Sequence, residues 1–391
     1  MDRTSYSFPV LKLGSYLWAG VLVPLSSLLM VVAVTVDGRL FAAAAILVGF
    51  LPIISLLACV AIDRRWRAVL VFLLFALVYC SISACVRSPS GRTSSRSRVK
   101  NIYADGRSTF RRYTIGNLLP EVDQLMLMFT LMPVVDSHFS QFQASRLKQW
   151  TAVIYHDLEA DCDFHALGST MPQAYDEALV GSCEHGHSFL YVPPGIDRSK
   201  SISAIVFLHG SGGNFKAYLW LLSRLADRLN MVVIAPTNGM GDWRLSETID
   251  VVNAALAAAS KQVNISPERI HLMGLSNGGL AVSQLASAQG SRYRSFIFLS
   301  PVFDVEMLRT VSFAQQCRER SVLILSGCDD DRVPIWYVEG NAADIAKAGG
   351  RVTVEAVEGA DHFLLFSHRD QVLLVLEKWF RANDAALGNG R

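Results

Sequence analysis

Three long apolar stretches dominate the first 86 residues of the chain. None contains a charged residue, and charged residues bound each of them: Leu13–Val36, Leu40–Ile62 and Ala68–Val86. A helix that crosses a bilayer needs about 20 apolar residues. Three successive stretches also argue against a cleaved signal peptide, which has a single short apolar core. The pattern predicts a membrane anchor of three helices over residues 1–86. Two helices, or a buried helical hairpin in a soluble protein, are the alternatives.

From residue 188 the pattern changes to short apolar runs that alternate with longer amphipathic segments. Seven runs are predicted strands: Phe189–Val192, Ala204–His209, Met231–Ala235, Ile270–Met273, Ser295–Leu299, Val322–Leu325 and Val352–Val357. Five segments are predicted helices: Lys216–Leu229, Glu247–Val263, Leu280–Ala288, Ile335–Lys347 and Gln371–Arg381. Strands that are apolar almost throughout are typical of a parallel sheet buried on both faces. We therefore predict an α/β domain over residues 188–385, with a doubly wound, mostly parallel sheet.

Two segments lie between the predicted anchor and this domain. Residues 87–100 are rich in Ser and Arg and contain no acid, which predicts a flexible basic linker. Residues 101–187 lack a clean period and are predicted to be a helical extension or lid. Within them, Leu118–Val135 is apolar and rich in methionine. It is predicted to be a helix packed on the main domain, with a lid over an apolar substrate site as the alternative.

The net charge of the chain limits its expected partners, and the positions of its Lys and Arg residues give a weak indication of how the anchor is oriented in the membrane. The net charge is +2, and the basic residues 87–100 have no interleaved aromatic residues, so nucleic acid is not an expected partner. Basic residues flank both ends of the apolar stretches almost equally. The basic residues 87–100 precede a long domain and are therefore discounted. The remaining Lys and Arg residues then favour a cytoplasmic N-terminus and an extracytoplasmic catalytic domain. The prediction is a multi-pass integral membrane protein.

A serine between two glycines follows the predicted strand Ile270–Met273. The segment reads Gly274-Leu275-Ser276-Asn277-Gly278 and leads into a predicted helix. This pattern at a strand-to-helix turn is typical of a nucleophile elbow, in which the serine has a strained backbone and glycines let strand and helix approach. The pentapeptide alone is equally typical of a glycine-rich turn. The assignment of Ser276 as a nucleophile therefore depends on its partners.

A glycine-rich loop, His209–Gly213, follows another predicted strand. Ligands bind at the carboxyl ends of strands in open α/β sheets. Backbone N–H groups at such a turn can stabilise an oxyanion, and we predict that those of Ser211, Gly212 and Asn277 do so. His209 is predicted to be a structural loop residue rather than a base.

An acid and a histidine follow the last two predicted strands. Asp330 is preferred over Asp329 and Asp331 as the acid, because of its spacing from Gly327 and Val333, and its neighbours are predicted surface charges. His362 completes the chain order Ser, Asp, His. Asp361 is predicted to shape the loop. The predicted catalytic residues are therefore Ser276, Asp330 and His362.

Together these features resemble the α/β-hydrolase superfamily over roughly residues 188–385. The paired segments Leu208–Gly213 and Arg269–Gly279 are similar to those of its esterase and polyhydroxyalkanoate-depolymerase-like branch. The resemblance implies acyl transfer to Ser276, with a small-molecule or lipid-like ester as substrate and neither metal nor organic cofactor. A serine peptidase or acyltransferase with the same triad, and an inert hydrolase-fold receptor or scaffold, are the alternatives. Neither the substrate nor the oligomeric state follows from the residues.

Two further features of the sequence each have a plainer explanation. Trp243 follows a predicted strand and is predicted either to line the substrate pocket or to pack in the core. A second group has side chains that can bind zinc but spacing that matches no strong zinc template: Cys162, His165, Cys183, His185 and His187. No metal is predicted there, and a Cys162–Cys183 disulfide or unlinked cysteines are preferred.

Overall fold

The computed structural model describes residues 7–60, 64–106, 110–197 and 199–388. The chain divides into two compact units. The helical unit comprises Met1–Pro89 and Arg112–Lys148, and the sheet unit comprises Ser90–Arg111 and Gln149–Arg391. These boundaries differ from the four predicted segments, since residues 101–187 are shared between the units. The reason is non-local contact, which a pattern along the chain does not report.

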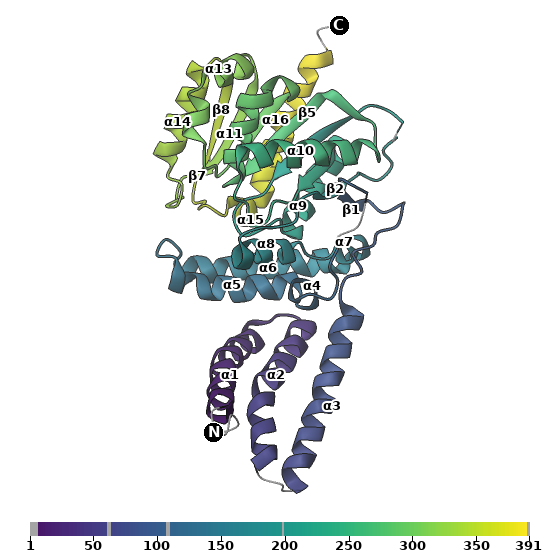
Figure 1. Ribbon diagram of the computed structural model, residues 1–391. Coiled ribbons are helices and arrows are strands. Elements are labelled where there is room, and N and C mark those ends of the chain that lie inside the picture. The colour runs from purple at the N-terminus through teal and green to yellow at the C-terminus, as the bar shows by residue number, and fades with distance from the viewer. Residues whose placement is uncertain (1–6, 61–63, 107–109, 198, 389–391) are drawn as a thin grey trace. The chain divides into compact units, whose positions relative to one another are not determined.

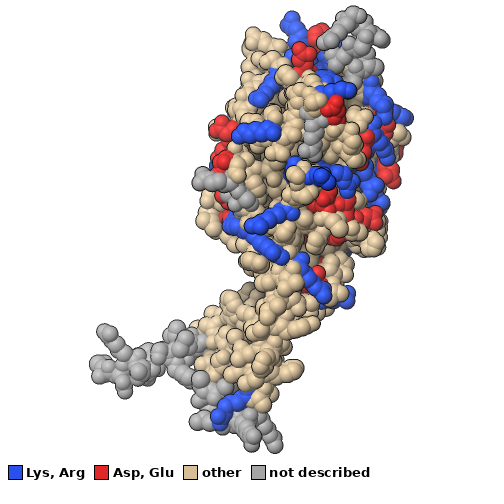
Figure 2. All heavy atoms as spheres, turned by 90° about the vertical axis from the view of Figure 1, so that its right-hand side faces the viewer, with Lys and Arg blue, Asp and Glu red and all other residues tan. Residues whose placement is uncertain are grey.

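The helical unit contains the three predicted long helices. They are α1 (Ser7–Val32), α2 (Val36–Val60) and α3 (Arg64–Arg87), followed by α4 (Ile115–Leu118) and α5 (Glu121–Val135). Stretches long and apolar enough to cross a membrane lie within them at Leu13–Val32, Val36–Leu56 and Arg67–Arg87. The predicted end of the second stretch at residue 62 lies outside the described residues. Figure 2 shows a surface almost without charged side chains along these helices, and charges of both signs over the sheet unit.

An eight-stranded sheet forms the centre of the sheet unit (Figure 1). The strand order is β1-β2-β4-β3-β5-β6-β7-β8, with β1 and β2 antiparallel and the rest parallel. The strands are β1 (Val99–Tyr103), β2 (His187–Tyr191), β3 (Ile202–Leu208), β4 (Val232–Pro236), β5 (Ile265–Leu275), β6 (Ser295–Leu299), β7 (Ser321–Gly327) and β8 (Arg351–Val357). All seven predicted strands are present. The predicted mostly parallel α/β fold is confirmed.

Helices cover both faces of the sheet. The longer helices after α5 are α6 (Gln141–Ala160, which has residues in both units), α8 (Met171–Val180), α9 (Lys216–Leu229), α10 (Leu245–Ser260), α11 (Gly278–Gln289), α14 (Ile335–Lys347) and α16 (Arg369–Gly388). The shorter ones are α7 (Cys162–Leu167), η1 (Gly290–Arg292), α12 (Val305–Leu308), α13 (Val311–Cys317) and α15 (Leu364–Ser367). Helix α9 contacts α16, whereas α10 contacts α11. The large core lies between the sheet and α10, α11 and α14.

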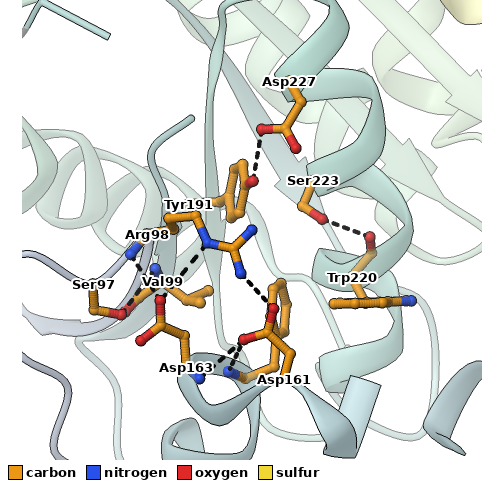
Figure 3. A network of polar contacts seen from close by, with 10 residues as sticks. Ser97, Arg98, Val99, Asp161, Asp163, Tyr191, Trp220, Ser223 and Asp227 are labelled. Carbon is orange, nitrogen blue, oxygen red and sulfur yellow. Dashed lines mark hydrogen bonds and ion pairs between the residues drawn. The ribbon is translucent and has the colours of Figure 1, made fainter. Parts of the chain in front are cut away.

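The sheet starts earlier in the chain than predicted. Strand β1 pairs with β2 from Val99↔Tyr191 to Tyr103↔His187, so the start at residue 188 is corrected. The end of the predicted linker is also ordered. The Arg98 guanidinium binds the Asp161 carboxylate, and the Arg98 backbone N–H donates to Asp163 at 3.2 Å (Figure 3). An edge strand of mixed polarity has no distinctive pattern, which explains why the sequence did not indicate it.

Candidate active site

Ser276 lies on a tight turn between β5 and α11. Its φ is +52°, in the left-handed region that few non-glycine residues adopt. The turn is held by backbone bonds, because the Ser276 N–H donates to the Leu299 carbonyl at 2.9 Å and the Ser276 carbonyl accepts from Val302 at 3.0 Å. The strained serine predicted from the sequence is therefore present, and its position is rigidly defined.

Close backbone approach explains the two glycines of this turn. A Cβ on Gly274 would overlap the Gly278 carbonyl, and a Cβ on Gly278 would overlap the Leu208 carbonyl. The first contact joins the strand to its own helix, and the second joins the start of α11 to the end of β3. Neither position has room for a side chain.

We expect Gly278→Ala to destabilise the sheet unit. The added methyl group must displace the backbone of β3, and overpacking of this kind typically costs about 1–3 kcal/mol. The unfolding midpoint in denaturant measures the effect. Gly340→Ala is the matched control: Gly340 lies inside α14 with no atom within 4 Å of an added Cβ, and alanine favours helix by up to about 1 kcal/mol. Equal midpoints for the two variants would contradict the close approach.

Ser276, His362 and Asp330 form one chain of hydrogen bonds. The Ser276 Oγ lies 2.9 Å from His362 Nε2, and His362 Nδ1 lies 2.8 Å from Asp330 Oδ2. An ionised carboxylate only accepts, so Nδ1 carries the proton and the Nε2 lone pair faces the serine hydroxyl. That is the tautomer a general base requires. His362 is 9% exposed and Asp330 is 4% exposed, which keeps water away from the bond between them.

The structure distinguishes Asp330 from the other aspartates nearby. Its Oδ1 accepts the N–H groups of Arg332 at 3.0 Å and Val333 at 2.8 Å, which fixes the carboxylate while Oδ2 faces the histidine. Asp329 and Asp331 are exposed. Asp361 accepts the N–H of Phe363 at 3.0 Å and so shapes the histidine loop, as predicted.

One of the three predicted oxyanion donors is corrected. The Gly212 N–H donates to the Met240 carbonyl at 2.8 Å, so it cannot also face a substrate. Within the described residues, neither the Ser211 nor the Asn277 N–H donates to a backbone carbonyl. The loop that carries Ser211 adjoins the serine, since a Cβ on Gly210 would lie 3.1 Å from that of Ser276. Ser211 and Asn277 therefore stay as the predicted donors.

His209 and Trp243 are buried residues that hold this loop. His209 Nδ1 lies 2.8 Å from the Gly210 carbonyl, and its Nε2 accepts the N–H of Asn238 at 3.0 Å. Both ring nitrogens are thus occupied, as expected of a structural residue. The Trp243 indole N–H donates to the His209 carbonyl at 2.9 Å, and its side chain is 3% exposed. We assign Trp243 to packing rather than to a pocket wall.

Helix α8 supports the same loop, which the sequence did not indicate. The Glu177 carboxylate accepts the N–H of Met240, whose carbonyl in turn accepts from Gly212. The Thr170 hydroxyl donates to the Asn214 carbonyl at 2.9 Å on the other side of the loop. The segment before β2 therefore positions the predicted oxyanion loop. No local motif marks Glu177, because its partners are about 60 residues away in the chain.

Two of the side chains that could bind zinc pair with groups outside that set. His165 binds Glu159 at 2.7 Å, and His187 binds Thr237 at 2.8 Å and Asn101 at 3.0 Å. Among the described residues no three His, Cys, Asp or Glu side chains are grouped as metal ligands. Cys162 and Cys183 are both free thiols. Burial, together with nearby carboxylates such as Glu177, raises the pKa of Cys183 to about 11.

Three buried histidines predict a loss of stability in acid. Burial lowers the pKa of His187 and His271 to about 3 and that of His209 to about 4. The same groups titrate near 6.5 in an unfolded chain, so below that pH the unfolded state binds more protons. The stabilisation that these neutral histidines give to the folded state is fully present above about pH 6.5. Below about pH 6.5 the free energy of unfolding decreases by up to about 1.4 kcal/mol per histidine for each pH unit.

The measurement is the free energy of unfolding by denaturant between about pH 7 and pH 5. We expect a steady decrease with acidification, which His187→Gln makes shallower. His156 is exposed, and His156→Gln is the control that leaves the slope unchanged. A pH-independent free energy over this range would show that these histidines are not held neutral by the fold.

A comparison with known protein families matches part of the sheet unit. A model of the prolyl oligopeptidase family (Peptidase_S9) matches residues 237–320, which include the serine turn. The chain has the α/β-hydrolase fold. A serine hydrolase is the class that the family match supports, and both peptidases and esterases belong to that class. The esterase and depolymerase-like branch that the loop motifs suggested stays a prediction, which this match does not test.

Individual relatives match only part of the chain. Dipeptidyl-peptidase 5 of Porphyromonas gingivalis is 26% identical over 155 residues, which is 35% of this chain and 22% of that protein. Esterase 2 of Thermogutta terrifontis, phosphorylated by paraoxon, is 18% identical with a TM-score of 0.41, covering 49% of this chain and 87% of that one. Est1E of Butyrivibrio proteoclasticus, with ferulic acid bound, is 16% identical with a TM-score of 0.41, covering 51% and 95%.

Proposed function

We propose that this protein is a membrane-anchored serine hydrolase that cleaves carboxylic esters. The observation that carries the proposal is the continuous chain of hydrogen bonds from the Ser276 hydroxyl through His362 to the buried Asp330 carboxylate. A serine hydroxyl is a weak nucleophile until a base accepts its proton, and His362 Nε2 is placed to do so. The apolar helices α1–α3 provide the anchor.

The reaction follows from these positions. Ser276 Oγ attacks the ester carbonyl carbon while its proton passes to His362 Nε2, and Asp330 stabilises the resulting imidazolium. The N–H groups of Ser211 and Asn277 stabilise the negative charge that forms on the carbonyl oxygen. The imidazolium then protonates the departing alcohol. Water, activated by the same histidine, cleaves the acyl-enzyme and releases the acid.

A peptide substrate is the second candidate, and a specific observation favours it. Both the matching family model and the curated relative are named as peptidases. The same residues cleave amides when the imidazolium protonates a leaving amine. The ester proposal rests on the Leu208–Gly213 and Arg269–Gly279 motifs, which resemble those of esterases. The two candidates differ in the leaving group and not in the catalytic residues.

A substrate panel tests the proposal. Membranes carrying the wild type or Ser276→Ala are assayed with p-nitrophenyl esters of increasing chain length and with dipeptidyl p-nitroanilides. We expect ester cleavage that depends on Ser276. Cleavage of the anilides at a higher kcat/KM would favour the peptidase. If a fluorophosphonate probe labels neither protein and no substrate is cleaved, the inert receptor or scaffold is the better explanation.

The sheet unit, which carries the proposed catalytic residues, is proposed to face the extracytoplasmic side of the membrane. The support is the distribution of basic residues around α1–α3, with the Ser- and Arg-rich residues 87–100 discounted because they precede a long domain. Protease access to the sheet unit in intact cells tests this orientation. Protection from protease until the cells are permeabilised would reverse it.

A further inference from the structure

One face of α5 begins with Asp123, continues with large apolar side chains, and is covered along only its first half. Asp123, Leu127, Leu131 and Val134 are spaced by three or four residues and therefore share this face, which we call the α5 stripe. The opposite face is buried: Leu125, Met126 and Phe129 are at most 7% exposed, and Phe129 stacks on Phe139 at 6.4 Å. The stripe is thus a second, separate surface of the helix.

The first half of the α5 stripe is fixed to the turn between α1 and α2. The Asp123 carboxylate accepts the backbone N–H groups of Val34 at 2.7 Å and Thr35 at 3.2 Å, and also binds the Thr35 hydroxyl. Leu127 packs with the apolar cluster at the ends of these two helices. Figure 1 shows α5 lying across those ends.

The second half of the α5 stripe is bare within the described chain. Leu131 is 37% exposed and Val134 is 79% exposed, and the neighbouring Val135 is 76% exposed. Val134 lies 11 residues beyond Asp123, which is about 16 Å along a helix axis. The α5 stripe therefore extends well past the helix ends to which it is attached.

Basic side chains gather at the same ends of α1–α3. The Arg39 guanidinium binds the Ala33 carbonyl at 3.2 Å, Arg87 pairs with Asp37 at 2.8 Å, and Arg112 donates to the Ser88 hydroxyl at 3.0 Å. Lys148 lies beside the α5 stripe, since its ammonium donates to the hydroxyl of Thr130, the residue before Leu131, at 3.3 Å. Arginine and lysine at the ends of apolar spans are typical of the headgroup level of a bilayer.

We infer that the bare half of the α5 stripe rests on the surface of the phospholipid bilayer, with α5 lying in the membrane plane. The inference depends on the proposed membrane anchor. If α1 and α2 end at the headgroups, a helix fixed across those ends is held at the same depth. Its apolar continuation then meets acyl chains instead of water. Amphipathic helices of this kind bury their apolar face a few ångströms below the headgroups.

The test uses the full chain in phosphatidylcholine–phosphatidylglycerol vesicles. A fluorescent amino acid, dansylalanine, is incorporated genetically in place of one residue at a time, and phosphatidylcholine brominated near the headgroup or near the chain ends serves as quencher. The labelled positions are Val134, Phe75 near the middle of α3, and the exposed Lys200 of the sheet unit. Because all three side chains are exposed, none of the replacements disturbs packing. Retained ester hydrolysis verifies the fold.

We expect the label at 134 to lose most emission with bromines near the headgroup, the label at 75 with bromines near the chain ends, and the label at 200 with neither. Quenching at 75 without quenching at 134 would overturn the surface contact and leave the anchor standing. Stronger quenching at 134 by deep than by shallow bromines would also overturn it. An unquenched label at 75 would instead refute the membrane anchor, whatever the label at 134 does.

Discussion

Replacement of Ser276 by alanine is expected to reduce kcat for ester hydrolysis by roughly 10⁴–10⁶-fold. The Ser276 hydroxyl is the nucleophile of the proposed reaction and lies 2.9 Å from His362 Nε2, so covalent catalysis is lost with it. Loss of the nucleophile from a triad typically costs about a millionfold, and the residual rate comes from binding and the oxyanion donors. The change is small in volume, and the backbone bonds that hold the turn do not involve the hydroxyl. Folding is therefore expected to persist.

Two measurements check this result. The kcat of purified protein in detergent gives the magnitude, and fluorophosphonate labelling gives the identity of the nucleophile. Ser291→Ala is the matched control, because Ser291 is an exposed serine on η1 of the same unit. Wild-type activity in Ser276→Ala would refute the proposed nucleophile. Equal loss in both serine variants would point to damage of the fold instead of the chemistry.

Replacement of Asp330 by asparagine is expected to reduce kcat by roughly 10⁴-fold. The asparagine Oδ1 keeps its two backbone donors at Arg332 and Val333, which turns the amide NH₂ towards His362 Nδ1. Nδ1 must then accept, so the neutral ring carries its proton on Nε2. That nitrogen can no longer take the proton of Ser276. The loss therefore comes from the wrong tautomer and not from altered positions.

The two adjacent aspartates provide controls, because the same substitution is made one position away from Asp330. Asp329→Asn and Asp331→Asn remove the same charge from exposed positions, and we expect each to keep nearly wild-type kcat. A large loss in Asp331→Asn, with Asp330→Asn active, would show that the acid was wrongly assigned.

Local patterns predicted most of the fold. The strands β2 to β8 all overlap their predicted ranges. Strands β2, β3, β4, β6 and β7 are buried along nearly their whole length, and a strand buried on both faces must be apolar nearly throughout. Strand β1 was missed because its residues, Val99–Tyr103, are only partly buried at the edge of the sheet. Its place depends on pairing with β2, about 90 residues later in the chain. Such pairing leaves no periodic signal.

Local patterns predicted some features of the candidate active site and not others. Each of its loops could be predicted, since each follows a strand that the sequence indicated. The direction of a single N–H group could not be predicted, because the Gly212 N–H donates to the carbonyl of Met240, which lies on another loop. The support of that loop by Glu177 is equally non-local. Hydrogen-bond direction depends on distant backbone, which a motif does not encode.

The amino-acid sequence by itself determined the elements and the order of the reactive groups. The charge-free stretches before residue 87 specify apolar helices, and Gly274 and Gly278 specify a turn that only glycine allows around Ser276. The tertiary structure alone decided which groups meet. It buried Asp330 against His362 while Asp329 and Asp331 stayed exposed, and it fixed Asp123 to the α1–α2 turn, which leaves Val134 bare. The physical reason is that composition and backbone sterics act locally, whereas hydrogen bonding and burial depend on residues that only folding brings together.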